Sequence, residues 1–209
     1  MKNKKDVKIL VVDDESYIRE VVHQGLEGAG YEVEEASDGQ TALSMIRQFP
    51  YDVIITDLKL PGLSGENLLE EAVSLYPEVI VIIMTGFGTI QSAVEAMSKG
   101  AYWYLAKPFQ LSELVTQVER GLKERRLESE NELLRSELRE KYQFSNIIGA
   151  SPAMQNIYRI IEAVAPKTST VLIEGETGTG KELIARAIHY NGPRKNYPLV
   201  SVNCGAIPA

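Results

Sequence analysis

Residues 7–16, VKILVVDDES, decide the fold class of the first half of the chain. Five of the six residues at positions 7–12 are apolar, and four of these are β-branched, which is typical of a buried strand. Three acidic residues, Asp13, Asp14 and Glu15, follow directly. A dinucleotide-binding fold would carry a glycine-rich phosphate loop at this point. The acidic ending therefore excludes a nucleotide phosphate here and favours a bound cation.

Four similar segments follow along the chain, separated by stretches whose apolar residues have helical spacing. The five predicted strands are 7–12, 31–36, 52–56, 79–85 and 101–106. Strands that alternate with helices over about 120 residues predict an α/β fold, with a five-stranded parallel sheet covered on both faces. Ligands of such sheets bind beyond the carboxyl ends of the strands.

Turn and capping residues mark the boundaries of the predicted helices. Gly30 is expected to close the first helix, Ser37 or Asp38 to cap the second, and Ser64 to cap the third. Pro61, followed by glycine, breaks the chain before that third helix.

Five polar side chains are expected to meet at one edge of this sheet because each follows or ends a strand. They are Asp13, Asp14, Asp57, Thr85 and Lys107. Two carboxylates about 4 Å apart repel by about 4 kcal/mol at an effective dielectric constant of about 20. A divalent metal would offset this repulsion, and oxygen ligands favour Mg²⁺ or Mn²⁺. Taken singly, each residue could instead cap a helix, end a turn or lie on the surface.

These residue types together suggest phosphoryl transfer to a carboxylate. A carboxylate can attack phosphorus and form an acyl phosphate. We expect Asp57 to be this nucleophile and the two consecutive aspartates before the first helix to hold the metal. Lys107 and Thr85 would then bind the oxygens of the phosphoryl group.

The motifs of residues 7–122 resemble the receiver domain of bacterial two-component response regulators. The resemblance rests on VVDDE at 11–15, ITDLKLPGLSG at 55–65, TGFG at 85–88, Tyr104 and KPF at 107–109. It implies a flavodoxin-like (βα)5 receiver domain over residues 1–122 that accepts phosphate from a partner sensor histidine kinase. It also implies that the Lys59 main-chain carbonyl completes a Mg²⁺ site with Asp13, Asp14 and Asp57. A cis Lys107-Pro108 bond and a switch formed by Thr85 and Tyr104 are further implications.

Residues 123–145 are predicted to form a long helical linker. Between residues 119 and 141, 14 of 23 residues are charged, seven of each sign, and there is no proline. Leu111, Val115, Val118 and Leu122 have heptad spacing, and so do Leu127, Asn131, Leu134 and Leu138. The two sets are out of phase, so we expect the first to pack on its own sheet. The second would seek the same helix in a homodimer, unless the linker is a monomeric surface helix with many ion pairs.

The third segment, residues 146–209, carries the pattern of a phosphate-binding loop. GETGTGKE spans Gly175, Glu176, Thr177, Gly178, Thr179, Gly180, Lys181 and Glu182, between a predicted strand at 170–173 and a predicted helix. Main-chain amides and the helix start would hold the phosphates of ATP, with Lys181 at the β and γ positions. Glu182 replaces the usual serine or threonine ligand of Mg²⁺.

The surrounding sequence is similar to the start of the AAA+ ATPase domain of sigma-54-dependent activators of the nitrogen-regulation type. The matching stretches are 147–166, 171–195 and 202–208. In that family glutamate after the lysine is usual. The resemblance implies that sigma-54 RNA polymerase and promoter DNA are partners of a complete protein only. Residues 146–209 contain no Walker B strand or arginine finger, so this incomplete P-loop α/β segment is not expected to be an enzyme.

Two other functions remain open at this point. The chain could be an ATP-binding enzyme whose first domain is an inert dimerisation module, or a stand-alone receiver with a non-functional tail. Composition restricts the class of protein further. The chain has 209 residues, a net charge of −7 and a single cysteine, Cys204, which cannot form an internal disulfide. We therefore expect a cytoplasmic globular protein with no membrane segment.

Overall fold

The structure of the chain, a computed structural model, describes residues 4–86, 90–141 and 151–203, and for residues 139–141 the main chain only. The chain divides into two compact units, Met1–Leu127 and Glu128–Ala209, which are considered separately below. The predicted boundary between residues 145 and 146, Phe87 and Gly88 of the TGFG stretch, and Cys204 lie outside the described residues.

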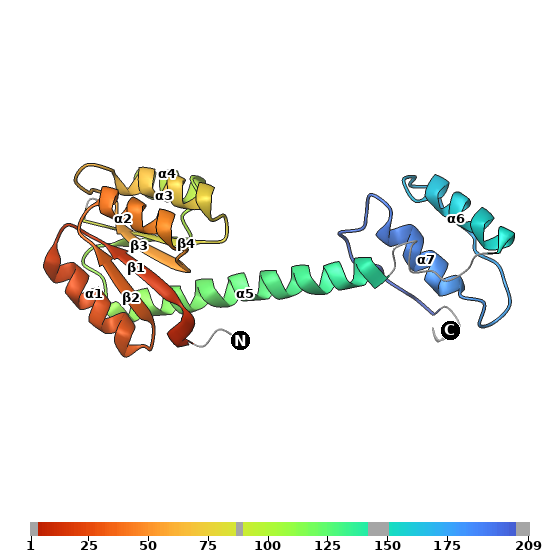
Figure 1. The fold of residues 1–209 in the computed structure, drawn as a ribbon, viewed down its shortest axis with the longest axis horizontal. Coiled ribbons are helices and arrows are strands. Elements are labelled where there is room, and N and C mark those ends of the chain that lie inside the picture. Colours follow the sequence, from red (N-terminus) through yellow and green to blue (C-terminus); the bar gives the residue numbers. More distant parts are fainter. Residues whose placement is uncertain (1–3, 87–89, 142–150, 204–209) are drawn as a thin grey trace. The chain divides into compact units, whose positions relative to one another are not determined.

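The first unit alternates strands and helices, as the sequence predicts (Figure 1). Its elements are η1 (Lys4–Asp6), β1 (Lys8–Val12), α1 (Ser16–Gly28), β2 (Glu32–Ala36), α2 (Gly39–Gln48), β3 (Val53–Asp57), α3 (Gly65–Leu75), β4 (Ile80–Thr85), α4 (Ile90–Ser98), β5 (Trp103–Ala106) and the first part of α5 (Leu111–Lys141), which continues beyond Leu127. All strand pairs are parallel, in the order β2-β1-β3-β4-β5. The five predicted strands are confirmed, with ends shifted by one or two residues.

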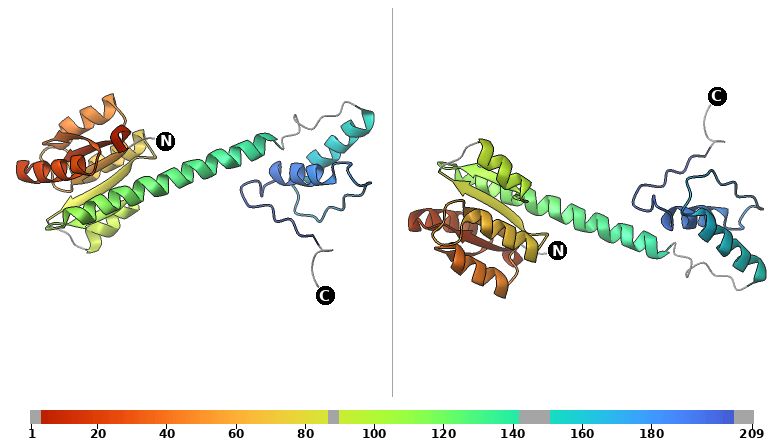
Figure 2. Two further views of the ribbon diagram at one scale, coloured as in Figure 1. Left: turned by 90° about the horizontal axis from the view of Figure 1, so that it is seen from below. Right: turned by 90° about the horizontal axis from the view of Figure 1, so that it is seen from above.

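Helices cover both faces of the sheet (Figures 1 and 2). Alternate residues of a strand point to opposite faces, so Leu10 of β1 packs with α2, α3 and α4, and Ile9 packs with α1 and α5. Both side chains are fully buried. The central strands β3 and β4 are buried along their whole length, which is typical of parallel strands with two covered faces. These two cores fix the positions of the strand ends.

Three predicted helix caps are present in the structure. The Asp38 carboxylate accepts a hydrogen bond from the Thr41 N–H at 2.8 Å, and Ser64 caps α3 through the Asn67 N–H at 3.3 Å. Gly30, just after α1, has a φ of 97°, a value that glycine adopts without strain. The side chain of Asp38, rather than that of Ser37, makes the cap of α2.

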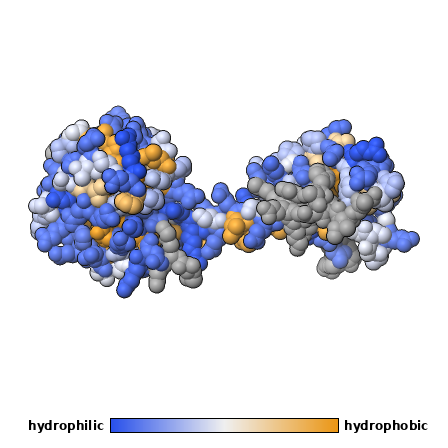
Figure 3. Space-filling model, viewed as in Figure 1, coloured by the Kyte–Doolittle hydropathy of each residue, from blue (hydrophilic) through white to orange (hydrophobic). Residues whose placement is uncertain are grey.

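Helix α5 begins on the sheet and continues as the predicted linker. Leu114 and Val118 are fully buried against β5 and its neighbours, and Leu122 packs at the edge of the same core. The heptad reading omitted Leu114. Leu127, Leu134 and Leu138 are 55%, 60% and 40% exposed, so the second set of apolar residues has no cover within the described residues. Figure 3 shows apolar patches on this otherwise hydrophilic part of the chain.

The second unit contains α6 (Pro152–Val164) and α7 (Lys181–Tyr190). Ser151 caps α6 through the Met154 N–H at 3.3 Å. The predicted strand at 170–173 is wrong, because these residues form no regular structure. A strand needs a neighbour to pair its main-chain groups, and the described part of this unit offers none. Leu172 is accordingly 82% exposed.

No helix among the described residues is long and apolar enough to span a membrane.

Candidate functional site

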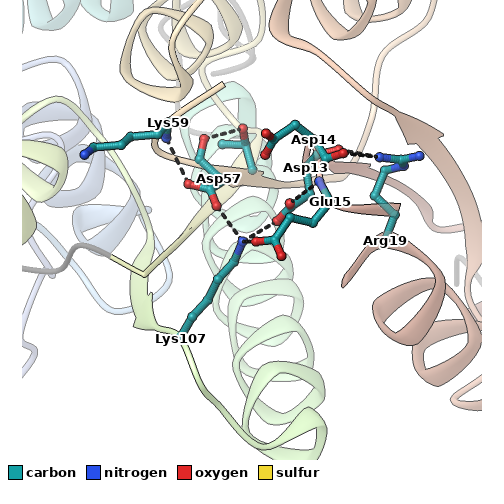
Figure 4. A network of polar contacts seen from close by, with 8 residues as sticks. Asp13, Asp14, Glu15, Arg19, Asp57, Lys59 and Lys107 are labelled. Carbon is teal, nitrogen blue, oxygen red and sulfur yellow. Dashed lines mark hydrogen bonds and ion pairs between the residues drawn. The ribbon is translucent and has the colours of Figure 1, made fainter. Parts of the chain in front are cut away.

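Three of the predicted site residues converge at the carboxyl edge of the sheet (Figure 4). Asp13 follows β1, Asp57 ends β3 and Lys107 follows β5. β1 and β3 are neighbours, so the two aspartates start from adjacent strand ends. Asp13 is fully buried and Asp57 is 8% exposed. Two carboxylates with so little access to water need a positive charge nearby.

The Lys107 ammonium supplies this positive charge in the structure. Its Nζ lies 2.6 Å from Asp13 Oδ2 and 2.5 Å from Asp57 Oδ2. The Glu15 carboxylate is more distant, at 3.7 Å, and its side chain is 65% exposed. We expected Lys107 to bind the phosphoryl group, and the structure brings its ammonium to Asp57, the predicted phosphoryl acceptor.

Burial and ion pairing act in opposite directions on the ionisable groups of this site. Burial raises the pKa of Asp13 above its ordinary value, although hydrogen bonds from Lys107 and from the Glu15 N–H oppose the rise. Burial alone would lower the pKa of Lys107, but its hydrogen bonds to the two aspartates outweigh this effect and raise the pKa. The lysine is therefore charged at neutral pH. Burial still disfavours the ionised form of Asp13, because the hydrogen bonds oppose this effect only in part.

Two further hydrogen bonds, from residues close to it in the chain, hold Asp57 in place. The Lys59 N–H donates to Asp57 Oδ1 at 2.9 Å, and the Thr56 hydroxyl donates to the Asp57 carbonyl oxygen at 3.1 Å. The Lys59 side chain is exposed and points away from the carboxylates (Figure 4). Each carboxylate oxygen of Asp57 thus has a defined donor, which fixes the orientation of the side chain.

A glycine that sequence reasoning missed allows α3 to start against Asp57. A Cβ at Gly65 would lie 2.0 Å from the Asp57 carbonyl oxygen, a distance that no side chain tolerates. The Gly65 N–H also donates to the Leu58 carbonyl at 3.0 Å. The signal for this role in the sequence is the glycine directly after Ser64, but a glycine at this position is equally compatible with a turn.

The predicted switch residues lie on β4 and β5. Thr85 is 1% exposed at the end of β4, and its carbonyl accepts a hydrogen bond from the Lys107 N–H at 2.8 Å. Tyr104 is partly buried, and its hydroxyl lies 2.9 Å from the hydroxyl of Ser92 on α4. The Lys107-Pro108 bond is cis, as predicted.

Asp14 is placed differently from the other predicted metal ligands. It is exposed, and no group of three acidic, histidine or cysteine side chains that could hold a metal occurs among the described residues. Among the predicted metal ligands, Asp13 and Asp57 share a contact through the Lys107 ammonium. Two oxygen ligands with a partly compensated charge still suit Mg²⁺, which commonly uses one or two carboxylates together with water.

The glycine-rich loop of the second unit closes on its own lysine. Gly178 and Gly180 have φ values of 85° and 86°, and α7 begins at Lys181. The Lys181 ammonium donates to the carbonyls of Gly175 and Glu176 at 2.8 and 2.6 Å. The lysine thus closes the loop onto itself, and within the described part of this unit no strand leads into it.

Of the remaining predicted loop residues, Thr177, Thr179 and Glu182 are exposed. The Thr179 hydroxyl donates to the Glu176 carbonyl at 2.8 Å. Glu182 pairs with Arg186 one turn later, at 2.6 Å, and so stabilises the start of α7.

Sequence comparison agrees with this geometry. Residues 9–119 match the family described as the response regulator receiver domain. The chain belongs to the response regulator receiver family. Residues 147–209, after this receiver domain, match the sigma-54 interaction domain.

Curated relatives of this receiver protein match nearly the whole chain. The regulatory protein AtoC of Escherichia coli is 39% identical over 201 residues, which cover 96% of this chain and 44% of AtoC. The DNA-binding transcriptional regulator NtrC of a Bradyrhizobium strain is 41% identical over 202 residues, covering 96% of this chain and 41% of NtrC. The chain therefore spans less than half the length of these relatives.

Solved structures also resemble this chain, one over nearly its whole length and another over little more than half of it. NtrX from Brucella abortus has a TM-score of 0.65 at 38% identity, covering 96% of this chain and 44% of its own. A receiver domain protein from Clostridium thermocellum has a TM-score of 0.55 at 38% identity, covering 58% of this chain and 98% of its own.

Proposed function

We propose that the chain is a phosphorylation switch in which Asp57 accepts a phosphoryl group from a partner sensor histidine kinase. One observation carries the proposal: the Lys107 ammonium contacts both Asp57 and the fully buried Asp13. The Asp57 carboxylate attacks phosphorus, an acyl phosphate bond forms, and the P–N bond of the phosphohistidine breaks, leaving its electron pair on the imidazole. Lys107 already lies beside the attacking group and can neutralise a phosphoryl oxygen.

Asp13 and Asp57 would hold Mg²⁺, with Asp14 and the Lys59 carbonyl as further proposed ligands. The metal, when bound, supplies positive charge that offsets the charge of the phosphoryl oxygens. The raised pKa of Asp13 supports this assignment, because burial leaves its negative charge incompletely compensated by Lys107. The chemistry of the donors is also that of a Mg²⁺ site, since all of them are oxygens.

We further propose that Thr85 and Tyr104 transmit phosphorylation to the surface of α4. Thr85 ends the strand next to Asp57, so its hydroxyl can approach a phosphoryl group there. Tyr104 contacts Ser92 of α4, and a movement of the threonine would change the space available to the tyrosine ring. Helix α5 follows β5 directly, so this face is continuous with the linker.

The output of the switch is proposed to be the pairing and assembly of attached AAA+ domains. The exposed Leu127, Leu134 and Leu138 favour a homodimer through the linker. Residues 175–182 would bind ATP once the domain is complete, and NtrX from Brucella abortus has been solved in complex with ATP. A complete protein would act in the cytoplasm on sigma-54 RNA polymerase at promoter DNA, whereas residues 146–209 alone would not hydrolyse ATP.

Phosphorylation by a small donor tests the proposal directly. Incubation with acetyl phosphate and Mg²⁺ should add the mass of one phosphoryl group, and hydroxylamine, which cleaves acyl phosphates, should remove it. Asp57→Asn should abolish the adduct, while Asp38→Asn, at a helix cap in the same domain, should retain it. An adduct that persists in Asp57→Asn, or its absence from the unmodified chain, would leave the inert dimerisation module as the better explanation.

A further inference from the structure

The loop that carries the proposed metal ligands is held by an arginine that lies outside the acidic cluster. Arg19 Nη1 donates to the main-chain carbonyl of Asp13 at 2.7 Å and to that of Asp14 at 3.2 Å. Figure 4 shows Arg19 and Lys107 on opposite sides of Asp13. Two consecutive carbonyls that point toward one guanidinium define the course of the main chain between β1 and α1.

Glu35 holds the arginine in turn. The Arg19 Nε lies 3.3 Å from Glu35 Oε2, and the arginine side chain is only 17% exposed. Glu35 belongs to β2, and the carbonyl of the next residue, Ala36, accepts the Asp13 N–H at 3.3 Å. The end of β2 therefore fixes the loop twice, once directly and once through the Arg19–Glu35 pair.

The start of α1 needs such support because it has no side-chain cap. The N-cap residue, Glu15, makes no capping hydrogen bond with its side chain. Its N–H instead donates to Asp13 Oδ1 at 3.0 Å, so the orientation of that carboxylate depends on the path of the loop. A change in the direction of the main-chain carbonyls of Asp13 and Asp14 would rotate the side chains of these two residues.

We infer that Arg19, oriented by Glu35, is a positioning residue for the Mg²⁺ site, which sets metal affinity by fixing the main chain of Asp13 and Asp14. The inference rests on the proposed function, since it requires that these residues bind the metal. Groups that orient metal ligands typically change affinity by about 10- to 100-fold when they are removed.

The sign of the effect separates positioning from simple electrostatics. The guanidinium is positive and lies beside the proposed metal ligands, so loss of its charge alone would strengthen the binding of a cation. Loss of positioning would weaken it. Arg19→Ala is therefore expected to lower the affinity for Mg²⁺ by about tenfold or more, against the direction of the charge effect.

Calorimetric titration of the unphosphorylated chain with MgCl₂ measures this affinity without reference to phosphorylation. Arg19→Lys keeps the charge but lacks the separate guanidinium nitrogens that face the loop carbonyls and Glu35. Its affinity for Mg²⁺ should therefore lie between those of the unmodified chain and Arg19→Ala. Arg47→Ala is the matched control, because Arg47 pairs with Glu71 at the exposed surface of α2 and α3. It should not alter the affinity.

A second measurement separates positioning from general damage. At saturating Mg²⁺, Arg19→Ala should recover the phosphorylation rate of the unmodified chain with acetyl phosphate, because a weakened site can be filled by mass action. Unchanged or tighter Mg²⁺ binding by Arg19→Ala would overturn the inference, and so would a deficit that persists at saturation. If Arg19→Ala does not fold, an unaltered affinity in Arg19→Lys would overturn it equally. No Mg²⁺ binding by the unmodified chain would instead overturn the proposed metal site, and this inference with it.

Discussion

Removal of the Arg125 guanidinium should destabilise the receiver unit, because a buried carboxylate then loses a positive charge that pairs with it. Asp52, just before β3, has a side chain that is 8% exposed, and its Oδ1 lies 3.2 Å from Arg125 Nη1. The Asp52 Oδ2 accepts the Lys8 N–H at 3.1 Å. Arg125 belongs to α5, so this contact fastens the helix to the amino-terminal edge of the sheet, opposite the proposed phosphorylation site.

The size of the effect lies between the limits for buried and exposed pairs. Breaking a fully buried pair costs about 3–5 kcal/mol, and breaking an exposed one about 0–1 kcal/mol. The Arg125 side chain is 30% exposed, and Asp52 keeps the main-chain donor of Lys8. We therefore expect Arg125→Ala to lower the free energy of unfolding by about 2 kcal/mol, within the range for the loss of a hydrogen bond to a charged group.

Urea unfolding of the unmodified chain, Arg125→Ala, Asp52→Asn and the double variant measures this coupling. The two single losses should not add, because each removes the same contact. Arg120→Ala is the control: Arg120 pairs with Glu124 on the exposed surface of α5 and should matter little. If Arg125→Ala unfolds at the same urea concentration as Arg120→Ala, the contact does not hold the helix and the reasoning is wrong.

Three further changes test other parts of the structure. Leu134→Asp should shift a dimer toward monomer in sedimentation velocity without altering phosphorylation, and a monomeric unmodified chain would contradict the linker dimer. Gly65→Ala should lower the free energy of unfolding by about 1–3 kcal/mol through overpacking and should slow phosphorylation by acetyl phosphate; unchanged values of both would contradict the close approach to Asp57. Burial, together with a hydrogen bond to Glu34, raises the pKa of Tyr51, so the folded state keeps its proton when the unfolded chain loses it. The stabilisation from this tyrosine is complete below about pH 10 and is lost at higher pH. Between about pH 9 and 11, the free energy of unfolding measured with urea should therefore fall less for Tyr51→Phe than for the unmodified chain.

Local patterns in the sequence predicted the sheet and the convergence of its strand ends. Short segments rich in β-branched, aromatic or other apolar residues identified the five strands, and the carboxyl ends of parallel strands necessarily meet at one edge. Asp57 and Lys107 could therefore be brought together without a structure. The caps at Asp38 and Ser64 followed from residue types whose side chains compete for free main-chain donors.

Contacts between distant elements could not be predicted in this way. Arg19 and Arg125 are ordinary helix residues in the sequence, and their long side chains can reach many partners. Only the fold places Glu35 and Asp52 within their range. The strand predicted at 170–173 failed for a related reason, because a β-branched run becomes a strand only when another strand pairs with it.

Charge balance links the observed contacts of Lys107 to the proposed switch. Two carboxylates, Asp13 and Asp57, share one ammonium, so this trio carries one excess negative charge. A divalent cation would leave the trio with one excess positive charge. Phosphorylation of Asp57 replaces a single negative charge with nearly two, which brings the same group close to neutrality. The charges of this trio therefore balance when both Mg²⁺ and the phosphoryl group are present, so we expect each of the two to favour binding of the other.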